Sequence, residues 1–203
     1  MIWQRVQRAL YPLPMAPQIT APTQADYADL FEQRSEFVAA AVLLGLVERK
    51  RHEPSILLTR RTERLSQHAG QVALPGGRID PTDVDEVGAA LREANEEIGL
   101  QFQHVEPLGF VDPICTITGF RVVPVVARID PAHVSRPCAD EVAEIFEVPL
   151  DFILEPSNAH RVQTDFQGKS RHYWQFEYRD QRIWGATAMM LLNLRDRMTA
   201  SGR

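Results

Sequence analysis

The sequence predicts an α/β protein, a single domain in which helices flank a mixed sheet. Two apolar segments, Phe37–Val47 and Ser55–Arg61, are separated by the charged turn Glu48–Pro54 and have the composition of paired strands. A later segment, Val84–Ile98, has the apolar spacing of a helix. No internal repeat or long linker divides the 203 residues, of which 44% are apolar and 24% charged, so one core is expected.

An N-terminal appendage is predicted to precede this domain. Residues Met1–Leu10 have the pattern of an amphipathic helix, and the proline-rich segment Tyr11–Pro22 is expected to be extended. Thr23 is expected to cap a second helix that reaches about Arg34. We therefore divide the chain into a helical and proline-rich appendage, residues 1–35, and the main domain, residues 36–203.

The remaining elements follow from apolar periodicity and breaker residues. In the helix Val84–Ile98 the apolar side chains fall on one stripe, and Gly99 is expected to end the helix in the left-handed conformation. Pro124 lies inside one expected strand, which points to a sheet edge or a bulge. Further strands are expected at His104–Val111, Arg121–Ile129, Glu141–Val148, His172–Tyr178 and Gln181–Trp184, and further helices at Asp151–Leu154 and Thr187–Met198.

Charge and cysteine content argue against several functional classes. The net charge of −5 argues against a nucleic-acid-binding protein, because such binding depends on a basic surface. Cys115 and Cys138 form neither a CxxC pair nor a metal-binding cluster with histidines, which favours a cytoplasmic protein without disulfides. The longest apolar run, Phe37–Val47, is too short to span a membrane, and we expect no export signal and no membrane partner.

Three glutamates, Glu93, Glu96 and Glu97, give the strongest functional signal. Because each helical residue advances by about 100°, their carboxylates share one face of the predicted helix. Unpaired like charges at this spacing destabilise a helix, so a bound cation explains the cluster well. Hard oxygen ligands select Mg²⁺ or Mn²⁺, and such a site is suited to hydrolysing a diphosphate. The upstream pair Gly76–Gly77 lets the backbone turn sharply and approach a ligand.

The segment Arg92–Leu100 resembles the second half of the Nudix box, G-x5-E-x7-R-E-U-x-E-E-x-G-U with U aliphatic, at every fixed position. In the first half, Gly77 and Arg92 are one residue further apart than in the pattern, and Asp83 stands where the loop glutamate is expected. The resemblance implies a Nudix-type α/β/α sandwich with a mixed sheet. The loop ligand or salt-bridge partner stays open among Asp80, Asp83 and Asp85.

An upstream segment is similar to the signature of the coenzyme A pyrophosphatase branch of that family, LLTxRSxxxRxxxGxxxFPGG. Thr62, Ser66 and Leu74 stand where the signature has Ser, Arg and Phe. Ser66 is the largest departure, because a hydroxyl binds phosphate less well than a guanidinium does. The resemblance implies a Mg²⁺-dependent hydrolase that cleaves coenzyme A or acyl-coenzyme A to 4′-phosphopantetheine and adenosine 3′,5′-bisphosphate. The matching residues are Leu57, Leu58, Thr59, Arg61, Gly70, Pro75, Gly76 and Gly77.

The resemblance also implies roles for individual residues. Glu93 and Glu97 are the expected principal metal ligands, and Glu96 completes the cluster. The Gly77 carbonyl is a further candidate ligand, and Arg92 is expected to hold Glu93 or pair with the loop acids. Glu141 and Glu144 are alternative candidates for a further ligand or general base. The candidate substrate-binding residues are Arg60, Arg61, Arg64, His68, Gly76, Gly77 and Arg78.

Three alternatives stay open beside a coenzyme A hydrolase. The first is the same chemistry on ADP-ribose, a dinucleotide or a nucleoside triphosphate, and Ser66 keeps it open. The second is a Nudix-fold module that binds a nucleotide without hydrolysing it, against which the intact glutamate cluster argues. The third is an interaction role for Met1–Leu10, for example as a homodimer contact. The expected partner is in each enzymatic case a small nucleotide diphosphate.

Overall fold

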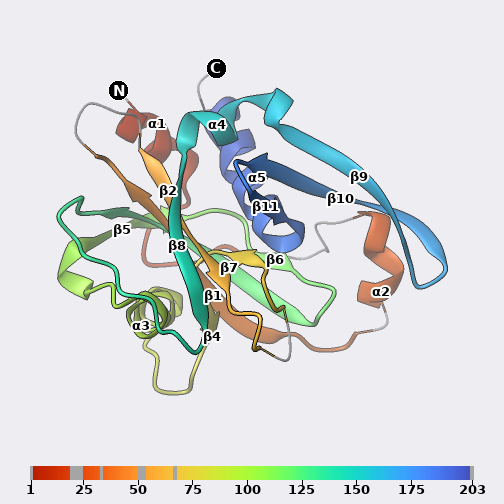
Figure 1. Ribbon diagram of the computed structural model, residues 1–203, viewed down its shortest axis with the longest axis horizontal. Helices are drawn as coiled ribbons and strands as arrows, with labels where there is room; N and C mark the ends of the chain where they lie inside the picture. The colour runs from red at the N-terminus through yellow and green to blue at the C-terminus, as the bar shows by residue number, and fades with distance from the viewer. Residues whose placement is uncertain (1, 19–24, 33, 50–53, 66–67, 202–203) are drawn as a thin grey trace.

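The computed structural model describes residues 2–18, 25–32, 34–49, 54–65 and 68–201, and its centre is a mixed sheet. The strands of this sheet are β1 (Val38–Val47), β2 (Ser55–Arg61), β3 (Val72–Ala73), β4 (Gly76–Arg78), β5 (Val105–Phe110), β6 (Ile114–Cys115), β7 (Phe120–Ile129) and β8 (Val142–Pro149). The main path is β3-β2-β1-β7-β5, with β4 paired to β1, β6 to β7 and β8 to β2 (Figure 1).

β1 lies in the interior of this sheet. It runs parallel to β7 over its whole length, beginning with Val38 opposite Phe120. Its C-terminal end pairs antiparallel with β2, which confirms the predicted hairpin. Its N-terminal part pairs antiparallel with β4, where Ala41 lies opposite Gly77. The glycine pair is therefore anchored to an interior strand.

Helices cover both faces of the sheet (Figure 1). α3 (Glu86–Ile98) packs on one face, over a core that includes Leu43 and Val125. α5 (Gly185–Ala200) covers the other face together with α1 (Ile2–Ala9) and α4 (Leu150–Leu154). This arrangement confirms the predicted α/β/α sandwich with an N-terminal helix.

A second, antiparallel sheet lies beside α5 (Figure 1). It contains β9 (Ala159–Phe166), β10 (Lys169–Tyr178) and β11 (Gln181–Trp184), in the order β11-β10-β9. α2 (Ala28–Glu32), which follows the 3-10 turn Ala25–Tyr27, is attached to this sheet. Arg171 of β10 is buried and donates to both carboxylate oxygens of Asp29, at 2.7 and 2.9 Å.

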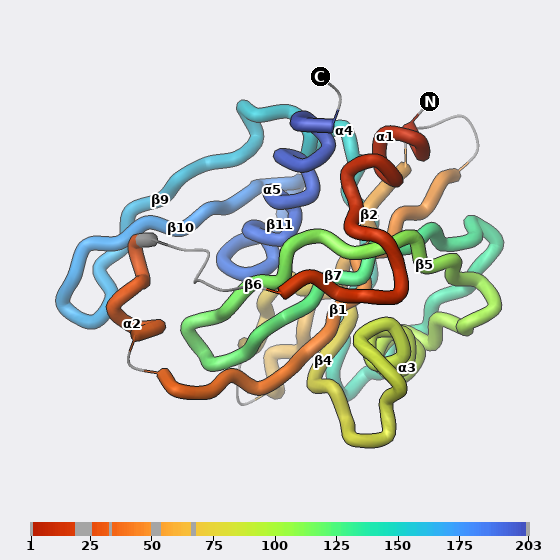
Figure 2. The backbone as a smooth tube through the Cα atoms, turned by 180° about the vertical axis from the view of Figure 1, so that it is seen from behind, coloured from red at the N-terminus to blue at the C-terminus, as the bar shows by residue number. Residues whose placement is uncertain are grey.

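The N-terminal segment is built into the main fold. Val6 and Ala9 of α1 are buried in the core on the α5 side. Tyr11 then forms an isolated bridge with Phe110 of β5, and Figure 2 shows this segment crossing the back of the molecule beside β5 and β6. The apolar side of α1, which the sequence predicted as one face of an amphipathic helix, packs against the core of its own chain.

A sheet edge or a bulge was expected at Pro124, and the edge is wrong because β7 is an interior strand. The register shift between β5 and β7 lies nearby, between Pro107 and Gly109 of β5. On one side Pro124 lies opposite Val42 of β1. Its carbonyl accepts from the Val111 N–H at 3.4 Å on the other side, where β5 has ended and β6 has not begun. The proline nitrogen faces this same interval between strands, so its missing N–H interrupts no regular ladder.

A short apolar strand was expected directly before the glycine pair and is present as β3, whereas β4, β6 and β9 were not predicted. β4 and β6 are only two or three residues long and show no periodicity. β9 is largely polar and exposed, so it lacks the apolar pattern of a strand. The sequence feature that could have indicated it is the turn to β10, where Gln167 and Gly168 both have positive φ, as hairpin turns require. The predicted cap at Thr23, the tip of the predicted turn at 50–53 and Ser66 lie outside the described residues.

Candidate active site

α3 begins and ends near the predicted positions, and this sets the register of its glutamates. Asp85 caps the N-terminus by accepting from the Gly88 N–H at 2.8 Å, and Gly99 ends the helix with a φ of 66°. Ala90 and Ala94 are fully buried, so the helix lies close against β1 and β4. The glutamates of its last two turns therefore lie beside the glycine pair.

Glu93 and Glu97 are in direct contact with that glycine pair. The Glu97 carboxylate, on a residue only 5% exposed, accepts from the Gly76 N–H at 3.1 Å. A Cβ on Gly77 would come within 2.6 Å of the Glu93 carboxyl carbon. A Cβ on Gly76, which has a φ of 148°, would come within 2.4 Å of the Ala41 carbonyl oxygen. Gly77 thus leaves the room that the Glu93 carboxylate occupies, and Gly76 lets the backbone pass close to β1.

Burial raises the cost of ionising both carboxylates. It raises the pKa of Glu97 to about 7, although the Gly76 N–H and the charge of Arg61 oppose this effect. Burial also raises the pKa of Glu93, against the hydrogen bond from Arg92. A bound cation would favour the ionised form of both groups and offset this cost.

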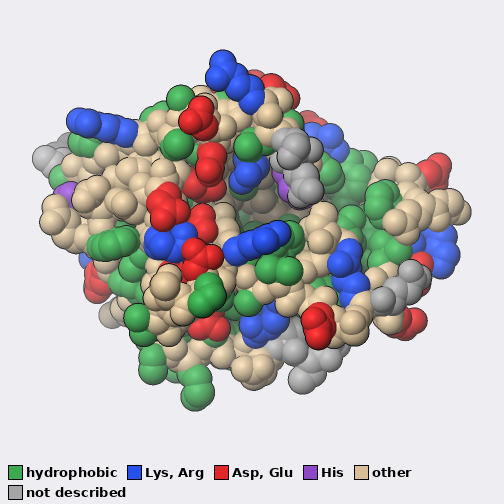
Figure 3. All heavy atoms as spheres, turned by 90° about the horizontal axis from the view of Figure 1, so that it is seen from below, with side chains coloured by type: hydrophobic (Ala, Val, Ile, Leu, Met, Phe, Trp, Pro, Cys, Tyr) green, Lys and Arg blue, Asp and Glu red, His purple; other side chains and the backbone are tan. Residues whose placement is uncertain are grey.

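Arg92 joins α3 to the loop that precedes it. Its Nε and Nη2 atoms each donate to the Asp83 carboxylate at 3.0 Å, and these bonds lower the pKa of Asp83. Its Nη1 atom donates to Glu93 at 3.0 Å and to Glu96 at 3.1 Å. Figure 3 looks onto this side of the molecule and shows acidic side chains gathered around basic ones, beside a hollow.

The three loop aspartates have different roles. Asp83 makes the two-bond pair with Arg92. Asp80 is exposed, with its carboxylate 3.8 Å from Arg92, and its N–H donates to Asp83 at 2.8 Å. Asp85 is the helix cap. Asp83 is therefore the salt-bridge partner among the three positions that the sequence left open.

The donor atoms suit a hard divalent cation, although they do not form a closed cage. Among the described residues, no three His, Cys, Asp or Glu side chains converge on one point. Glu96 is exposed and turns to Arg92, so the expected convergence of all three glutamates is not seen. The buried Glu97 and the partly buried Glu93 remain as paired oxygen donors beside backbone without a Cβ, and this set fits Mg²⁺ or Mn²⁺.

Neighbouring residues of β2 point to opposite faces of the sheet, and this separates the candidate arginines. Arg61 faces α3, with its Nη1 atom 3.7 Å from the Glu97 carboxylate. Arg60 lies on the other face, where its Nε atom is 3.2 Å from Glu144. Glu144 also accepts from Gln181 of β11 at 3.1 Å. The structure brings Arg61 to the helix glutamates and holds Arg60 and Glu144 together elsewhere.

Glu141 directly precedes β8, in a turn that is hydrogen-bonded to the end of α3. Its neighbour Val142 is buried in the core beneath α3, and the nearby Cys138 N–H donates to the Glu97 backbone carbonyl at 2.8 Å. Burial is the largest cause of the raised pKa of Glu93 and of Glu97, and the negative charge of Glu141 is a smaller contribution in the same direction. Of the two candidate acids beyond the box, Glu141 accompanies the helix glutamates and Glu144 does not.

Three other candidate substrate-binding side chains, those of Arg64, His68 and Arg78, point into solvent or away from the helix glutamates. Arg64 and His68 are exposed on the loop after β2, and His68 Nδ1 lies 2.9 Å from Gln71 Oε1. The Arg78 guanidinium lies 5.6 Å from the centre of the Phe120 ring. Arg78 is therefore held against an aromatic ring and away from the glutamates, while Arg64 and His68 face solvent.

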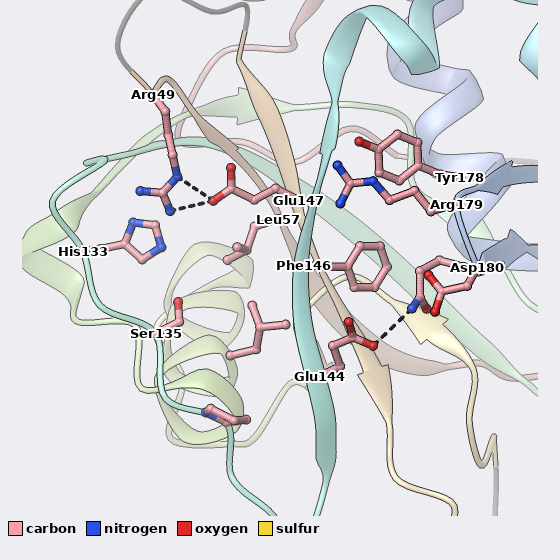
Figure 4. Close-up of a pocket in the computed structure, with 13 residues that line it drawn as sticks. Arg49, Leu57, His133, Ser135, Glu144, Phe146, Glu147, Tyr178, Arg179 and Asp180 are labelled. Atoms are coloured by element: carbon pink, nitrogen blue, oxygen red, sulfur yellow. Dashed lines mark hydrogen bonds and ion pairs between the residues drawn. The ribbon is translucent and has the colours of Figure 1, made fainter.

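A separate groove with a volume of about 710 Å³ runs along β8 (Figure 4). Arg49 and His133 line it on one side of β8, and Tyr178 lines it on the other. Glu144 belongs to its lining, whereas the three α3 glutamates do not. The Arg60 and Glu144 pair is therefore associated with this groove and not with the glutamate site.

Two contacts at the site were not expected from the sequence. The Gly76 N–H binds Glu97, although a glycine carbonyl was expected to be the functional group. The Thr62 hydroxyl donates to the Asp140 carbonyl at 3.1 Å. Thr62 occupies the serine position of the coenzyme A signature, so the hydroxyl at that position was the sequence feature that could have indicated this contact.

Among the described residues, no helix is long and apolar enough to cross a membrane.

Comparison with known proteins agrees with this geometry. The family model described as "NUDIX domain" matches residues 37–165. The chain belongs to the Nudix family. This Nudix protein is 41% identical over 180 residues to an uncharacterized Nudix hydrolase, NudL, from Salmonella heidelberg, which covers 89% of this chain and 87% of the relative. It is 43% identical over 155 residues to NudL from Salmonella paratyphi B, covering 76% and 80% of the two chains.

The fold of this Nudix protein also has solved counterparts. The crystal structure of a MutT/nudix family protein from Enterococcus faecalis matches with a TM-score of 0.50 at 15% identity. The match covers 87% of this chain and 69% of that one. At this identity the likeness concerns the fold alone.

Proposed function

We propose that this Nudix protein is a Mg²⁺- or Mn²⁺-dependent hydrolase that cleaves the diphosphate of coenzyme A or acyl-coenzyme A. Water breaks the link between the two phosphorus atoms and gives 4′-phosphopantetheine and adenosine 3′,5′-bisphosphate. The observation that carries the proposal is the approach of Arg61, from the coenzyme A signature, to Glu97, from the Nudix box, at 3.7 Å. Residues of the two signatures therefore meet at one place.

In this proposal Glu93 and Glu97 hold the cation, with Glu96 and the Gly77 carbonyl as further ligands. A bound divalent cation supplies charge neutralisation and lowers the pKa of the attacking water. Arg92 keeps Glu93 and Glu96 oriented through its hydrogen bonds to both.

Other side chains act on the substrate and the water. Arg61 neutralises a phosphate oxygen, because a guanidinium makes strong charge-assisted hydrogen bonds. Glu141 takes the proton of the attacking water as general base. Arg64 and His68, which are exposed, contact a phosphate of the substrate.

The departures from the coenzyme A signature differ in weight. Leu74, in place of the signature phenylalanine, is 3% exposed in the core on the α5 side, so it affects core packing and not ligand contact. Thr62 keeps a hydroxyl in place of serine. Ser66 alone removes a charge.

A substrate panel tests the proposal. The protein is incubated with coenzyme A, ADP-ribose, a dinucleotide and a nucleoside triphosphate, each with and without Mg²⁺. We expect the highest kcat/KM for coenzyme A, with adenosine 3′,5′-bisphosphate as product and no turnover without metal. Turnover of another diphosphate but not of coenzyme A would contradict the substrate and leave the reaction class intact.

Glu97→Gln is the control for the metal assignment. Changes in the outer shell of metal sites cost about 10–100-fold in activity, so loss of a ligand should cost at least about 100-fold. Circular dichroism should show a retained fold, because glutamine has nearly the same shape. Equal activity of this variant would contradict the metal assignment.

The second candidate is the same hydrolysis of another nucleoside diphosphate derivative, and Ser66 favours it. Ser66→Arg should raise kcat/KM for coenzyme A relative to ADP-ribose if the lost charge sets the preference. A non-hydrolysing nucleotide-binding module would bind members of the panel and release no product from any of them.

Three further assignments belong to the proposal. We assign a cytoplasmic location, in keeping with Cys115 and Cys138 as free thiols. We also place the hydrolase domain at residues 36–203, preceded by residues 1–35, whose first helix packs into the core of that domain. Light scattering of the full chain tests whether it forms a homodimer.

A further inference from the structure

The turn from Cys138 to Val142 carries Glu141 and is tied to α3. The Cys138 N–H donates to the Glu97 backbone carbonyl at 2.8 Å. Within the turn, the N–H groups of Glu141 and Val142 both donate to the Cys138 carbonyl, at 3.0 and 2.8 Å. The turn therefore follows the end of the helix from which the Glu97 side chain projects.

Thr62 holds the other side of this turn. Its N–H donates to the Glu141 carbonyl at 2.9 Å, and its hydroxyl donates to the Asp140 carbonyl at 3.1 Å. Thr62 itself is only 7% exposed, and it directly follows Arg61, which approaches Glu97. One buried residue thus binds two consecutive carbonyls of the turn.

The position of the Glu141 carboxylate depends on this backbone. Glu141 is an exposed residue, so burial of its side chain does not fix its location. A general base must reach its water at hydrogen-bond distance, and a misplacement of about 1 Å can cost about 100-fold in rate. Groups that hold the Asp140 and Glu141 carbonyls therefore control the reach of this acid.

We propose that Thr62 is a positioning residue for the hydrolysis: by holding the carbonyls of Asp140 and Glu141, it keeps the Glu141 carboxylate beside Glu93 and Glu97. The inference rests on the proposed function, since it gives Glu141 a part in the reaction. Thr62 does not itself touch the substrate, and its effect passes through Glu141.

Three variants separate this role from a general loss of stability. Thr62→Val keeps the shape of the side chain and removes the hydroxyl, whereas Thr62→Ser keeps the hydroxyl. Thr187→Val is the matched control, because Thr187 is equally buried at 7% exposure and its hydroxyl donates to the Val72 carbonyl at 3.0 Å. Thermal unfolding of all three confirms that they fold.

A double-mutant cycle with Glu141→Gln tests the kinetic role. Thr62→Val should lower kcat about tenfold and change KM less than about twofold, and Thr62→Ser should restore kcat. In the Glu141→Gln background, Thr62→Val should have no further effect, whereas any effect of Thr187→Val should be the same in both backgrounds. Independent, multiplicative losses from Thr62→Val and Glu141→Gln would overturn the proposal.

Hydrogen exchange tests the same tether without relying on activity. The amides of Glu141 and Val142 should exchange faster in Thr62→Val than in the wild type, Thr62→Ser or Thr187→Val. Unchanged exchange would overturn the proposal even if kcat falls. A wild-type protein that cleaves no diphosphate would overturn the proposed function and the catalytic part of this inference, while faster exchange would still show that Thr62 holds the turn.

Discussion

Arg92 donates to both carboxylate oxygens of Asp83, from Nε and from Nη2, each at 3.0 Å. The loop that carries Asp83 is one residue longer than the Nudix box asks, and the acid is one methylene shorter than glutamate. The shorter side chain in this longer loop still reaches Arg92. Because a bidentate pair is directional, Asp83 also orients the arginine that binds Glu93 and Glu96.

The first prediction concerns this pair. Asp83→Asn should lower kcat/KM about tenfold, because the amide loses the charge and one of the two accepting oxygens, so that Arg92 no longer holds Glu93 in one orientation. Steady-state kinetics with the best substrate of the panel measures this. The control is Asp80→Asn, whose carboxylate is exposed and 3.8 Å from Arg92 and which should change kcat/KM less than about twofold. Equal losses in both variants would contradict a special role for Asp83.

The two adjacent glycines should respond differently to alanine. In Gly77→Ala the three atoms nearest to the new Cβ all belong to the Glu93 carboxylate, which can rotate away, so the fold should persist while kcat falls about 10–100-fold. In Gly76→Ala the Cβ meets the Ala41 carbonyl at a positive φ, so the protein should lose at least about 1–3 kcal/mol of stability. Thermal unfolding and kinetics on both variants test this contrast. A Gly77→Ala variant with full activity would show that Glu93 does not need its present position.

Stability should depend on pH through the pair of Asp29 with Arg171. The hydrogen bonds from Arg171 hold the pKa of Asp29 well below its usual value. The carboxylate therefore stabilises the folded protein above pH about 4, and this contribution is lost as the pH falls through the lowered pKa. We expect the unfolding temperature of Asp29→Asn to lie below that of the wild type at pH 7 and the two to converge as the pH falls below about 4. A constant difference over this range would refute the linkage.

α1 should contribute to stability as part of the core. Val6 is fully buried between α1 and the α5 side of the sheet, so Val6→Ala should cost about 2 kcal/mol. Arg5 on the same helix is exposed, and Arg5→Ala should change stability by less than about 0.5 kcal/mol. Denaturant unfolding of the two variants gives both values. Equal, small changes would mean that α1 is an independent appendage.

Local signals in the sequence predicted most elements of the fold within a few residues. The capped helix and the hairpin of β1 and β2 were visible because caps, turns and apolar spacing act over a few residues. β9 was missed because its partner and its turn stabilise it more than its own apolar content does. Pro124 was wrongly expected at a sheet edge because proline lacks the N–H that a strand donates to its neighbour. At Pro124 no such donor is needed, since β5 has ended and β6 has not begun on that side of β7.

The sequence by itself determined that α3 presents Glu93 and Glu97 to one side, beside a glycine pair, because helix register and glycine conformation are local properties. Arg60 and Arg61 were grouped from the sequence as substrate-binding candidates, and alternation along β2 places them on opposite faces. Only the tertiary structure decided which face carries α3, and so that Arg61 and the turn of Glu141 join these glutamates. The physical reason is that alternation fixes only the relative orientation of neighbouring side chains. Which face lies beneath α3 depends on the pairing of β2 with β8 and on the packing of the helix over the sheet.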